Sequence, residues 1–154
     1  MEMHAAYVGL GSNLGDPAAN VEQAMTALAQ LGTVTKRSSL YKTKPWGNRA
    51  QPDFVNAAVL LETPLAAADL LAALKTLEKR LGRVDGERWG PRAIDLDLLT
   101  YDDLEIDEPG LRVPHPQLFE RAFVLAPLAE IDARYGASRD ALPCEELAGV
   151  AVLS

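Results

Sequence analysis

A strand-like run that carries two carboxylates constrains the fold of this chain most. Residues 94–101 read Ile-Asp-Leu-Asp-Leu-Leu-Thr-Tyr. Side chains alternate between the two faces of a strand, so the run predicts a strand with apolar residues on one face and Asp95 and Asp97 on the other. The two carboxylates then lie roughly 6.5–7 Å apart at the backbone.

Two like charges at this separation repel, so the acidic face needs a positive partner. Arg88 and Arg92 stand just upstream in Arg-Trp-Gly-Pro-Arg, and an arginine can bind a carboxylate or a phosphate with two hydrogen bonds. One or two divalent cations are the other candidates, because carboxylate oxygens suit magnesium. An exposed edge strand, with no chemistry on its acidic face, is the plain structural alternative.

The hydrophobic periodicity along the chain predicts the element order β-α-β-β-α-β. A helix begins at Asp16-Pro17, with Asp16 as N-cap and Pro17 at the first helical position, and ends at Gly32. A second helix opens at Thr63-Pro64 and ends at Gly82. The apolar runs that predict strands are residues 5–11, 34–41, 54–61 and 94–101.

This order predicts an α+β, ferredoxin-like fold, in which an antiparallel sheet carries both helices on one face. Turn residues at 107–110 and a helix over about 120–129 form a C-terminal helical extension. The length of 154 residues predicts a single domain, 1–154.

The composition of the chain argues against some classes of binding partner and indicates a cellular compartment. The net charge of −7 disfavours nucleic acid, which needs a basic footprint. No apolar run is long enough to span a bilayer, and the acidic N-terminus lacks the basic region of a signal peptide. The single cysteine, Cys144, fits a reducing compartment. We therefore expect a cytoplasmic protein that binds neither nucleic acid nor a membrane.

Three further motifs have a structural and a functional interpretation. Gly9-Leu-Gly-Ser-Asn-Leu-Gly15 has the wrong glycine spacing for a dinucleotide loop, and we interpret it as a tight strand-to-helix connection. In Val113-Pro-His-Pro116 the histidine is either incidental to a turn or a hydrogen-bond donor to phosphate. Asn56 lies in an apolar strand, where a buried amide needs partners. Phe54 and Phe123 are either core residues or the walls of a site for a flat ring.

Together these motifs resemble the hydroxymethyl-dihydropterin pyrophosphokinases of folate biosynthesis. The resemblance covers nearly the whole chain and is carried by Gly-Ser-Asn-Leu-Gly at 11–15, Gln51-Pro-Asp-Phe-Val-Asn-Ala-Ala58, Gly82-Arg83, Arg88-Trp-Gly-Pro-Arg-Ala-Ile-Asp-Leu-Asp97, Val113-Pro-His-Pro116 and Arg121-Ala-Phe-Val-Leu125. It implies a ferredoxin-like enzyme that transfers pyrophosphate from ATP, as co-substrate, to a reduced hydroxymethyl pterin and releases AMP.

The resemblance also implies a role for each matching residue. Asp95 and Asp97 hold two magnesium ions, and Arg83 and Arg92 stabilise the transferring phosphates. The residues that it assigns to ATP binding are Glu78, Arg88, Trp89, Arg92, Leu98, His115 and Arg121. Those that it assigns to the pterin are Thr43, Pro45, Trp46, Phe54, Asn56 and Phe123.

Two alternatives from other classes stay open on the sequence. The first is a noncatalytic ferredoxin-like module that binds a nucleotide or a protein, in which the two aspartates only form ion pairs with the arginines. The second is nucleic-acid binding on the open sheet face, against which the acidic charge argues.

Overall fold

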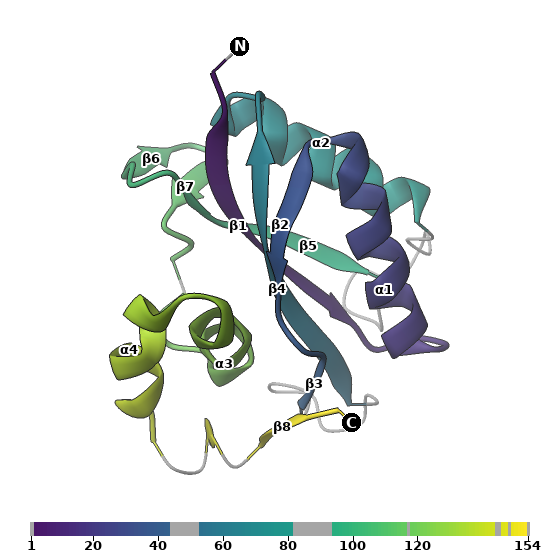
Figure 1. The fold of residues 1–154 in the computed structure, drawn as a ribbon, viewed down its shortest axis with the longest axis vertical. Coiled ribbons are helices and arrows are strands. Elements are labelled where there is room, and N and C mark those ends of the chain that lie inside the picture. Colours follow the sequence, from purple (N-terminus) through teal and green to yellow (C-terminus); the bar gives the residue numbers. More distant parts are fainter. Residues whose placement is uncertain are drawn as a thin grey trace.

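An antiparallel sheet with the strand order β5-β1-β4-β3-β8, in which β2 also pairs with β4, forms the centre of the computed structural model (Figure 1). The structure describes residues 2–43, 53–81, 94–116, 118–143, 146–147 and 149–153. The strands are β1 (His4–Ser12), β2 (Thr33–Arg37), β3 (Tyr41–Thr43), β4 (Phe54–Thr63), β5 (Asp95–Tyr101), β6 (Ile106–Glu108), β7 (Leu111–Val113) and β8 (Val150–Val152). The helices are α1 (Pro17–Ala27), α2 (Ala67–Arg80), α3 (Ala122–Ile131) and α4 (Gly136–Asp140), with 3-10 turns at Leu28–Gln30 and Ala133–Tyr135.

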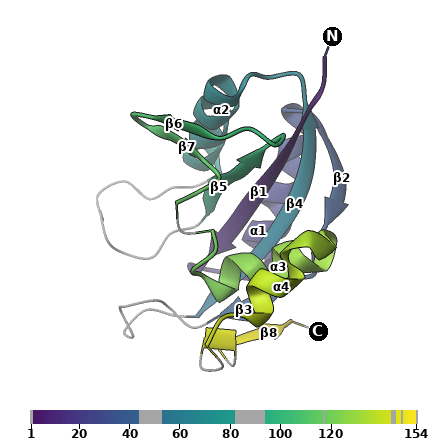
Figure 2. The same cartoon turned by 90° about the vertical axis from the view of Figure 1, so that its left-hand side faces the viewer.

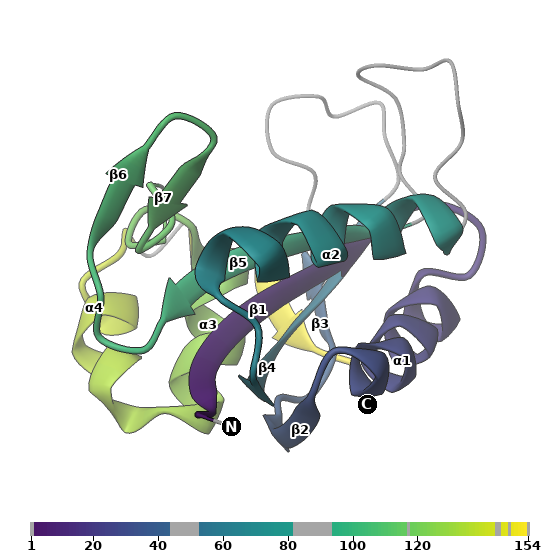
Figure 3. The ribbon, with the colours of Figure 1, turned by 90° about the horizontal axis from the view of Figure 1, so that it is seen from above.

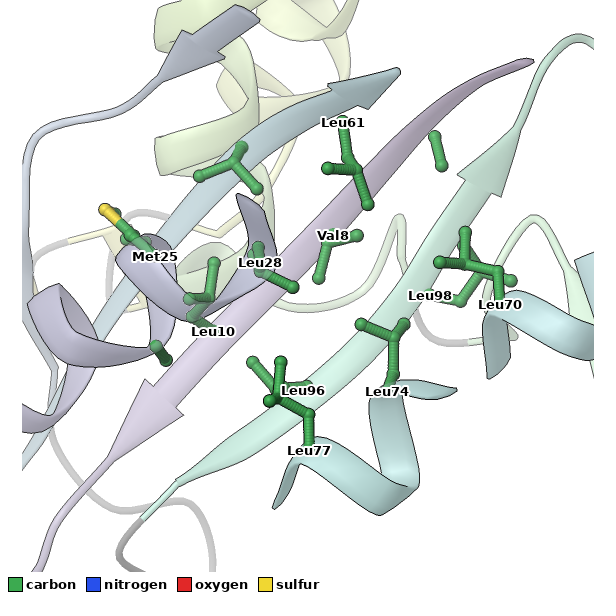
Figure 4. Packing of buried hydrophobic residues seen from close by; sticks show 14 of the residues in the cluster. Val8, Leu10, Met25, Leu28, Leu61, Leu70, Leu74, Leu77, Leu96 and Leu98 are labelled. Carbon is green, nitrogen blue, oxygen red and sulfur yellow. The ribbon is translucent and has the colours of Figure 1, made fainter. Parts of the chain in front are cut away.

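The sheet separates two layers of helices. Helices α1 and α2 lie on one face, and α3 and α4 lie on the other (Figures 2 and 3). Between the sheet and the first pair, buried side chains from β1, β4 and β5 pack against Val21 and Met25 of α1 and against the leucines of α2 (Figure 4). A smaller buried cluster joins α3 to the opposite face and contains Tyr7, Ala58, Leu99, Leu118 and Leu128. The predicted α+β, ferredoxin-like order is confirmed.

The start of α1 forms as its local sequence predicts. Asp16 is the N-cap, and its carboxylate accepts a hydrogen bond from the backbone N–H of Ala19 at 3.2 Å. Pro17 occupies the first turn, where its missing N–H costs nothing. The predicted helix end at Gly32 is wrong by a few residues, because α1 ends at Ala27 and a 3-10 turn over Leu28–Gln30 follows it. Gly32 itself passes close to β4, where a Cβ would lie 2.1 Å from the Glu62 carbonyl oxygen.

The single strand predicted over 34–41 is wrong, because two short strands, β2 and β3, replace it. Ser38 interrupts the pairing: its N–H donates to the Ala58 carbonyl and its hydroxyl accepts from the Ala58 N–H, both at 2.9 Å. The next residue, Ser39, donates its N–H to the Glu130 carboxylate on α3 at 2.8 Å. These side-chain contacts replace the regular ladder between β2 and β3.

The second helix does not open at Thr63-Pro64 as predicted. Thr63 is the last residue of β4, where it pairs with His4, and its hydroxyl donates to the Leu31 carbonyl at 2.7 Å. The helix N-cap is Ala66 instead. Thr63 is fully buried, so the sheet uses the hydroxyl that the pattern assigned to a cap.

The C-terminal extension is only partly helical. Its main helix, α3, covers Ala122–Ile131 rather than 120–129, and β8 then returns to the sheet beside β3. Of the turn residues predicted at 107–110, the first two belong to β6 and only Pro109 and Gly110 connect β6 to β7, with Gly110 in the left-handed backbone conformation at φ +82°. Among the described residues, no helix is long and apolar enough to cross a bilayer.

The packing of α2 on the sheet predicts a large effect of shortening Leu74. This side chain is completely buried between α2 and the sheet. We expect Leu74→Ala to lower the free energy of unfolding by about 2–5 kcal/mol, through lost burial and a residual cavity. Urea titration followed by circular dichroism measures the change.

Leu104→Ala is the matched control, because Leu104 is 51% exposed. Its effect should stay within about 0.5 kcal/mol. Equal losses in the two variants would contradict this assignment of the core.

Candidate active site

Strand alternation brings small, aromatic and acidic residues together on the face opposite α1 and α2. That face of the sheet forms the floor of a cavity of about 260 Å³, which α3 borders with its first turn. The residues that reach the cavity from the sheet are Gly9 and Gly11 of β1, Phe54, Asn56 and Ala58 of β4, and Asp95, Asp97 and Leu99 of β5. From the α3 side come Arg121, Phe123 and Val124.

Glycines stand opposite both aspartates in the sheet. Gly9 pairs with Asp97 and Gly11 with Asp95 across β1 and β5. Because glycine has no side chain, the floor beside each carboxylate is bare backbone, which a bound group can approach closely. The predicted role of Gly9 and Gly11 in a strand-to-helix connection is therefore wrong, whereas Gly15 does take a turn conformation, with φ +67°.

Gly11 also makes room for the side chain of Asn56. The two residues pair across β1 and β4, and a Cβ on Gly11 would lie 2.6 Å from Asn56 Oδ1. On its other side the Asn56 amide donates from Nδ2 to the hydroxyl of Thr43 at 2.7 Å. Both residues are buried, so this hydrogen bond fixes the amide in the cavity wall.

Aromatic rings and an arginine complete this cavity. Phe54 comes from the start of β4 and Phe123 from the first turn of α3, and both line the cavity half-buried. The Arg121 guanidinium carbon lies 5.3 Å from the centre of the Phe123 ring, a cation–π contact. Apolar rings with a few placed polar groups are typical of a site for a flat heteroaromatic ligand.

A second cavity of about 390 Å³ lies beyond the β5 edge, between α2 and the β6–β7 hairpin. Its walls include Leu71 and Lys75 of α2, Leu98 of β5, Arg112 of β7, and His115. Asp97 lines both this cavity and the first one. Among the described residues, Asp97 is therefore the one that the two cavities share.

The backbone holds His115 beside β5. Its N–H donates to the Leu99 carbonyl at 2.8 Å, two residues beyond Asp97. Burial lowers the pKa of the His115 imidazole below its usual 6.5, the nearby Asp97 carboxylate opposes that effect, and Arg121 and Lys75 reinforce it. Burial likewise lowers the pKa of Arg121, again opposed by Asp97. Asp97 is thus the common counter-charge of this basic group.

The donor set at Asp95 and Asp97 fits magnesium. Two carboxylates on one strand face supply hard oxygen ligands, and the neighbouring glycines leave space beside them. Within the described part of the chain, no three His, Cys, Asp or Glu side chains gather around one point. Magnesium is commonly held by one or two carboxylates together with substrate phosphates, which is the kind of site that this pair can form.

A model of the 7,8-dihydro-6-hydroxymethylpterin-pyrophosphokinase (HPPK) family matches residues 7–133. The chain belongs to that family. Two relatives carry the name 2-amino-4-hydroxy-6-hydroxymethyldihydropteridine pyrophosphokinase. The one from Methylorubrum extorquens is 47% identical over 84% of this chain and 83% of its own length. The one from Bacillus subtilis is 48% identical over 82% of this chain and 77% of its own length.

The fold also matches solved structures. The HPPK-DHPS of Plasmodium falciparum crystallised with pteroate superposes with a TM-score of 0.67 over 84% of this chain, at 15% identity. This chain spans about two-fifths of that one, 39% of its length. At such low identity the likeness supports the HPPK fold alone.

The structure brings together most of the predicted HPPK site residues that it describes. Asp95, Arg121 and every described residue predicted for the pterin line the first cavity, and Leu98 and His115 line the second. Glu78 lines neither, because its carboxylate accepts the Leu96 N–H on the far side of β5. The predicted residues that lie outside the described part of the chain are Pro45, Trp46, Arg83, Arg88, Trp89 and Arg92.

Three residues of the cavities escaped the sequence reasoning. Gly9 and Gly11 gave no sign that they face Asp97 and Asp95, because strand register depends on non-local pairing. Lys75 had a local signal: Leu71, Lys75 and Glu78 recur at helical spacing beside the leucine stripe of α2. That spacing places Lys75 and Glu78 on one face of the helix, toward β5.

The charges around His115 predict how its titration responds to substitution. Asp97→Asn removes the carboxylate that raises the His115 pKa, so that pKa should fall further below 6.5. Arg121→Met removes a positive charge and should raise it. Proton NMR of the imidazole signals measures both shifts.

The chain has only two histidines, so His4 serves as the internal reference for the same titration. A rise in the His115 pKa in Asp97→Asn would show that the two groups do not face each other.

Proposed function

We propose that the chain transfers pyrophosphate from ATP to the hydroxymethyl group of 6-hydroxymethyl-7,8-dihydropterin and releases AMP, a step of folate biosynthesis. The observation that carries this proposal is the position of Asp97, which lines both an aromatic cavity and a second cavity at the β5 edge. A transfer between two substrates needs its charge-bearing groups at their junction. The two relatives that are 47% and 48% identical to this chain carry the name of the enzyme that catalyses this transfer.

The first cavity is assigned to the pterin. Phe54 and Phe123 offer aromatic faces to the ring, and stacking contributes about 1 kcal/mol for each beyond burial. The Asn56 amide, fixed by Thr43, presents groups that can donate and accept, which matches the amide-like edge of a pterin. Pro45 and Trp46 are assigned to the same ligand by the family resemblance.

The second cavity is assigned to ATP. Leu71 and Leu98 give it apolar walls, and His115 and Lys75 bring polar groups toward Asp97. A neutral His115 can donate a hydrogen bond to a phosphate oxygen without adding a fixed charge. The family resemblance adds Arg83, Arg88, Trp89 and Arg92 to the phosphate and nucleotide contacts.

Asp95 and Asp97 are assigned to two magnesium ions. Bound there, the ions neutralise charge on the triphosphate and orient it. The protein's own contribution is to hold both carboxylates and Arg121 at the first cavity, with Asp97 also lining the second. In the transfer, the pterin hydroxyl oxygen loses its proton to solvent and forms a bond to the β-phosphorus, and the bond from that phosphorus to the α–β bridging oxygen breaks as AMP leaves. Such reactions depend on positioning and charge stabilisation more than on covalent catalysis.

The same proposal places one domain over residues 1–154 and a monomer in the cytoplasm. The continuous sheet supports a single domain, since β8 at 150–152 pairs with β3 at 41–43. The lone cysteine fits a reducing compartment.

The experiment mixes the protein with Mg-ATP and the reduced hydroxymethyl pterin and separates the products by chromatography. We expect AMP and the pterin pyrophosphate in equal amounts. Asp97→Asn should lower the turnover rate roughly 100-fold or more, because it removes a charge at the junction. Its circular dichroism spectrum should match that of the wild type.

Three results would contradict the proposal. Formation of ADP in place of AMP would change the reaction class. Nucleotide binding without any product would favour the noncatalytic module. Full activity in Asp97→Asn would exclude a role for this carboxylate in the transfer.

The close approach of Asn56 to Gly11 predicts that a substitution at Gly11 weakens pterin binding more than ATP binding. In Gly11→Ala the new Cβ would displace the Asn56 amide, which lies 2.6 Å from its position. Loss of a buried hydrogen-bonding group costs about 1–3 kcal/mol, so the KM for the pterin should rise roughly 10-fold or more. The KM for ATP should stay within about twofold, because Gly11 does not line the second cavity.

Gly136→Ala is the matched control, because a Cβ at Gly136 would meet nothing within 4 Å. Equal changes in the two KM values of Gly11→Ala would indicate a general distortion and contradict the assignment of Asn56.

A further inference from the structure

The outer edge of β5 is held by side chains of α2. In the strand order, β5 is the end strand of the main sheet, so part of its backbone has no neighbouring strand to pair with. At Leu96 the N–H and C=O groups face α2 and bind its side chains. Buried backbone groups need such partners, because leaving them without hydrogen bonds is costly.

Glu78 and Lys75 make these contacts. Glu78 Oε2 accepts the hydrogen bond from the Leu96 N–H at 2.6 Å, and Lys75 Nζ donates to the Leu96 carbonyl at 3.2 Å. The two side chains also pair with each other at 3.4 Å. Glu78 is only 2% exposed. A glutamate is rarely buried so fully unless it is paired, as Glu78 is with Lys75.

The position of Leu96 gives these contacts a functional meaning. Its N–H belongs to the peptide group that follows Asp95, and its C=O belongs to the peptide group that precedes Asp97. The Leu96 side chain is fully buried on the core face, whereas both carboxylates reach the cavity on the other face. The two contacts therefore immobilise the backbone on which the acidic pair stands.

We propose that Glu78 and Lys75 are positioning residues that hold the Asp95–Leu96–Asp97 backbone so that both carboxylates can bind the metal ions of the triphosphate. This inference rests on the proposed function, and it gives Glu78 a different role from the one that the family resemblance implies. The family resemblance implies that Glu78 contacts ATP, whereas its carboxylate is engaged by the backbone of β5. Groups that orient metal ligands in this way typically change metal affinity 10–100-fold when they are altered.

Two variants separate the length of the Glu78 side chain from its charge. Glu78→Asp keeps the charge but shortens the side chain by one methylene, so its carboxylate should no longer reach the Leu96 N–H. Glu78→Gln loses the charge but keeps an acceptor oxygen at the same distance. Both changes are small, which favours retention of the fold.

The readout is Mn²⁺ binding in the presence of a non-hydrolysable ATP analogue, followed by electron paramagnetic resonance. We expect Glu78→Asp to weaken Mn²⁺ binding roughly 10-fold and Glu78→Gln to weaken it less than about threefold. Analogue binding without metal should stay within about twofold of the wild type in both. Weaker metal-free binding would instead mean that Glu78 contacts the nucleotide, and it would overturn the proposal.

Tyr101→Phe is the matched control. The Tyr101 hydroxyl donates to the Leu65 carbonyl at 2.6 Å, so it ties β5 to the segment just before α2, but Tyr101 lines neither cavity. It should leave Mn²⁺ affinity unchanged. An equal loss of Mn²⁺ affinity in Tyr101→Phe and Glu78→Asp would mean that any loosening of β5 weakens metal binding, and it would overturn the proposal.

Hydrogen exchange of the Leu96 amide reports the contact independently of function. Exchange should be faster in Glu78→Asp and unchanged in Glu78→Gln. A wild-type protein that binds no metal–nucleotide would refute the proposed function. A wild type that binds it, with Glu78→Asp binding equally well, would refute the positioning role alone.

Discussion

Like charges can share one face of a strand only where something offsets their repulsion, and this condition shapes the centre of the molecule. Asp95 and Asp97 lie on the end strand of the sheet, with leucines on the core face, the first cavity on the other face and the second cavity beyond the strand edge. Their cross-strand neighbours on β1 are glycines, so that strand presents only backbone beside them. Basic groups approach from three directions: Arg121 from the start of α3, His115 from the segment after β7, and Lys75 from α2. The acidic pair thus organises residues that are far apart in the sequence.

The features that could be predicted from sequence are those with local causes. Asp16 and Pro17 set the start of α1 through contacts within one turn, and the alternation at 94–101 was enough to place both aspartates on one face. The aromatic and amide residues of the first cavity were recognised as a group only through the resemblance to a family. Their convergence follows from the pairing of β4 with β1 and from the packing of α3 on β4.

The features that could not be predicted have distant causes. The break at Ser38 depends on Ala58 and on Glu130, and the late start of α2 depends on the contact of Thr63 with Leu31. Neither partner can be identified from a local pattern. The contact of Glu78 could not be predicted for a similar reason: nothing in the sequence indicates that its carboxylate meets the backbone of β5.

The pairing of β8 with β3 has a consequence for how the pterin-side cavity holds its shape. Tyr41 pairs with Val152 and Thr43 with Val150, so a cavity wall near residue 43 is braced by a segment more than a hundred residues away. Only three residues on each strand take part, and short edge pairings open at a small fraction of the global unfolding free energy. Thr43, which orients Asn56, therefore lies next to the edge pairing of the sheet that opens most easily. The cavity therefore has one wall on the central strands β1, β4 and β5, which should open least, and one wall at the β3–β8 edge, which should open more readily.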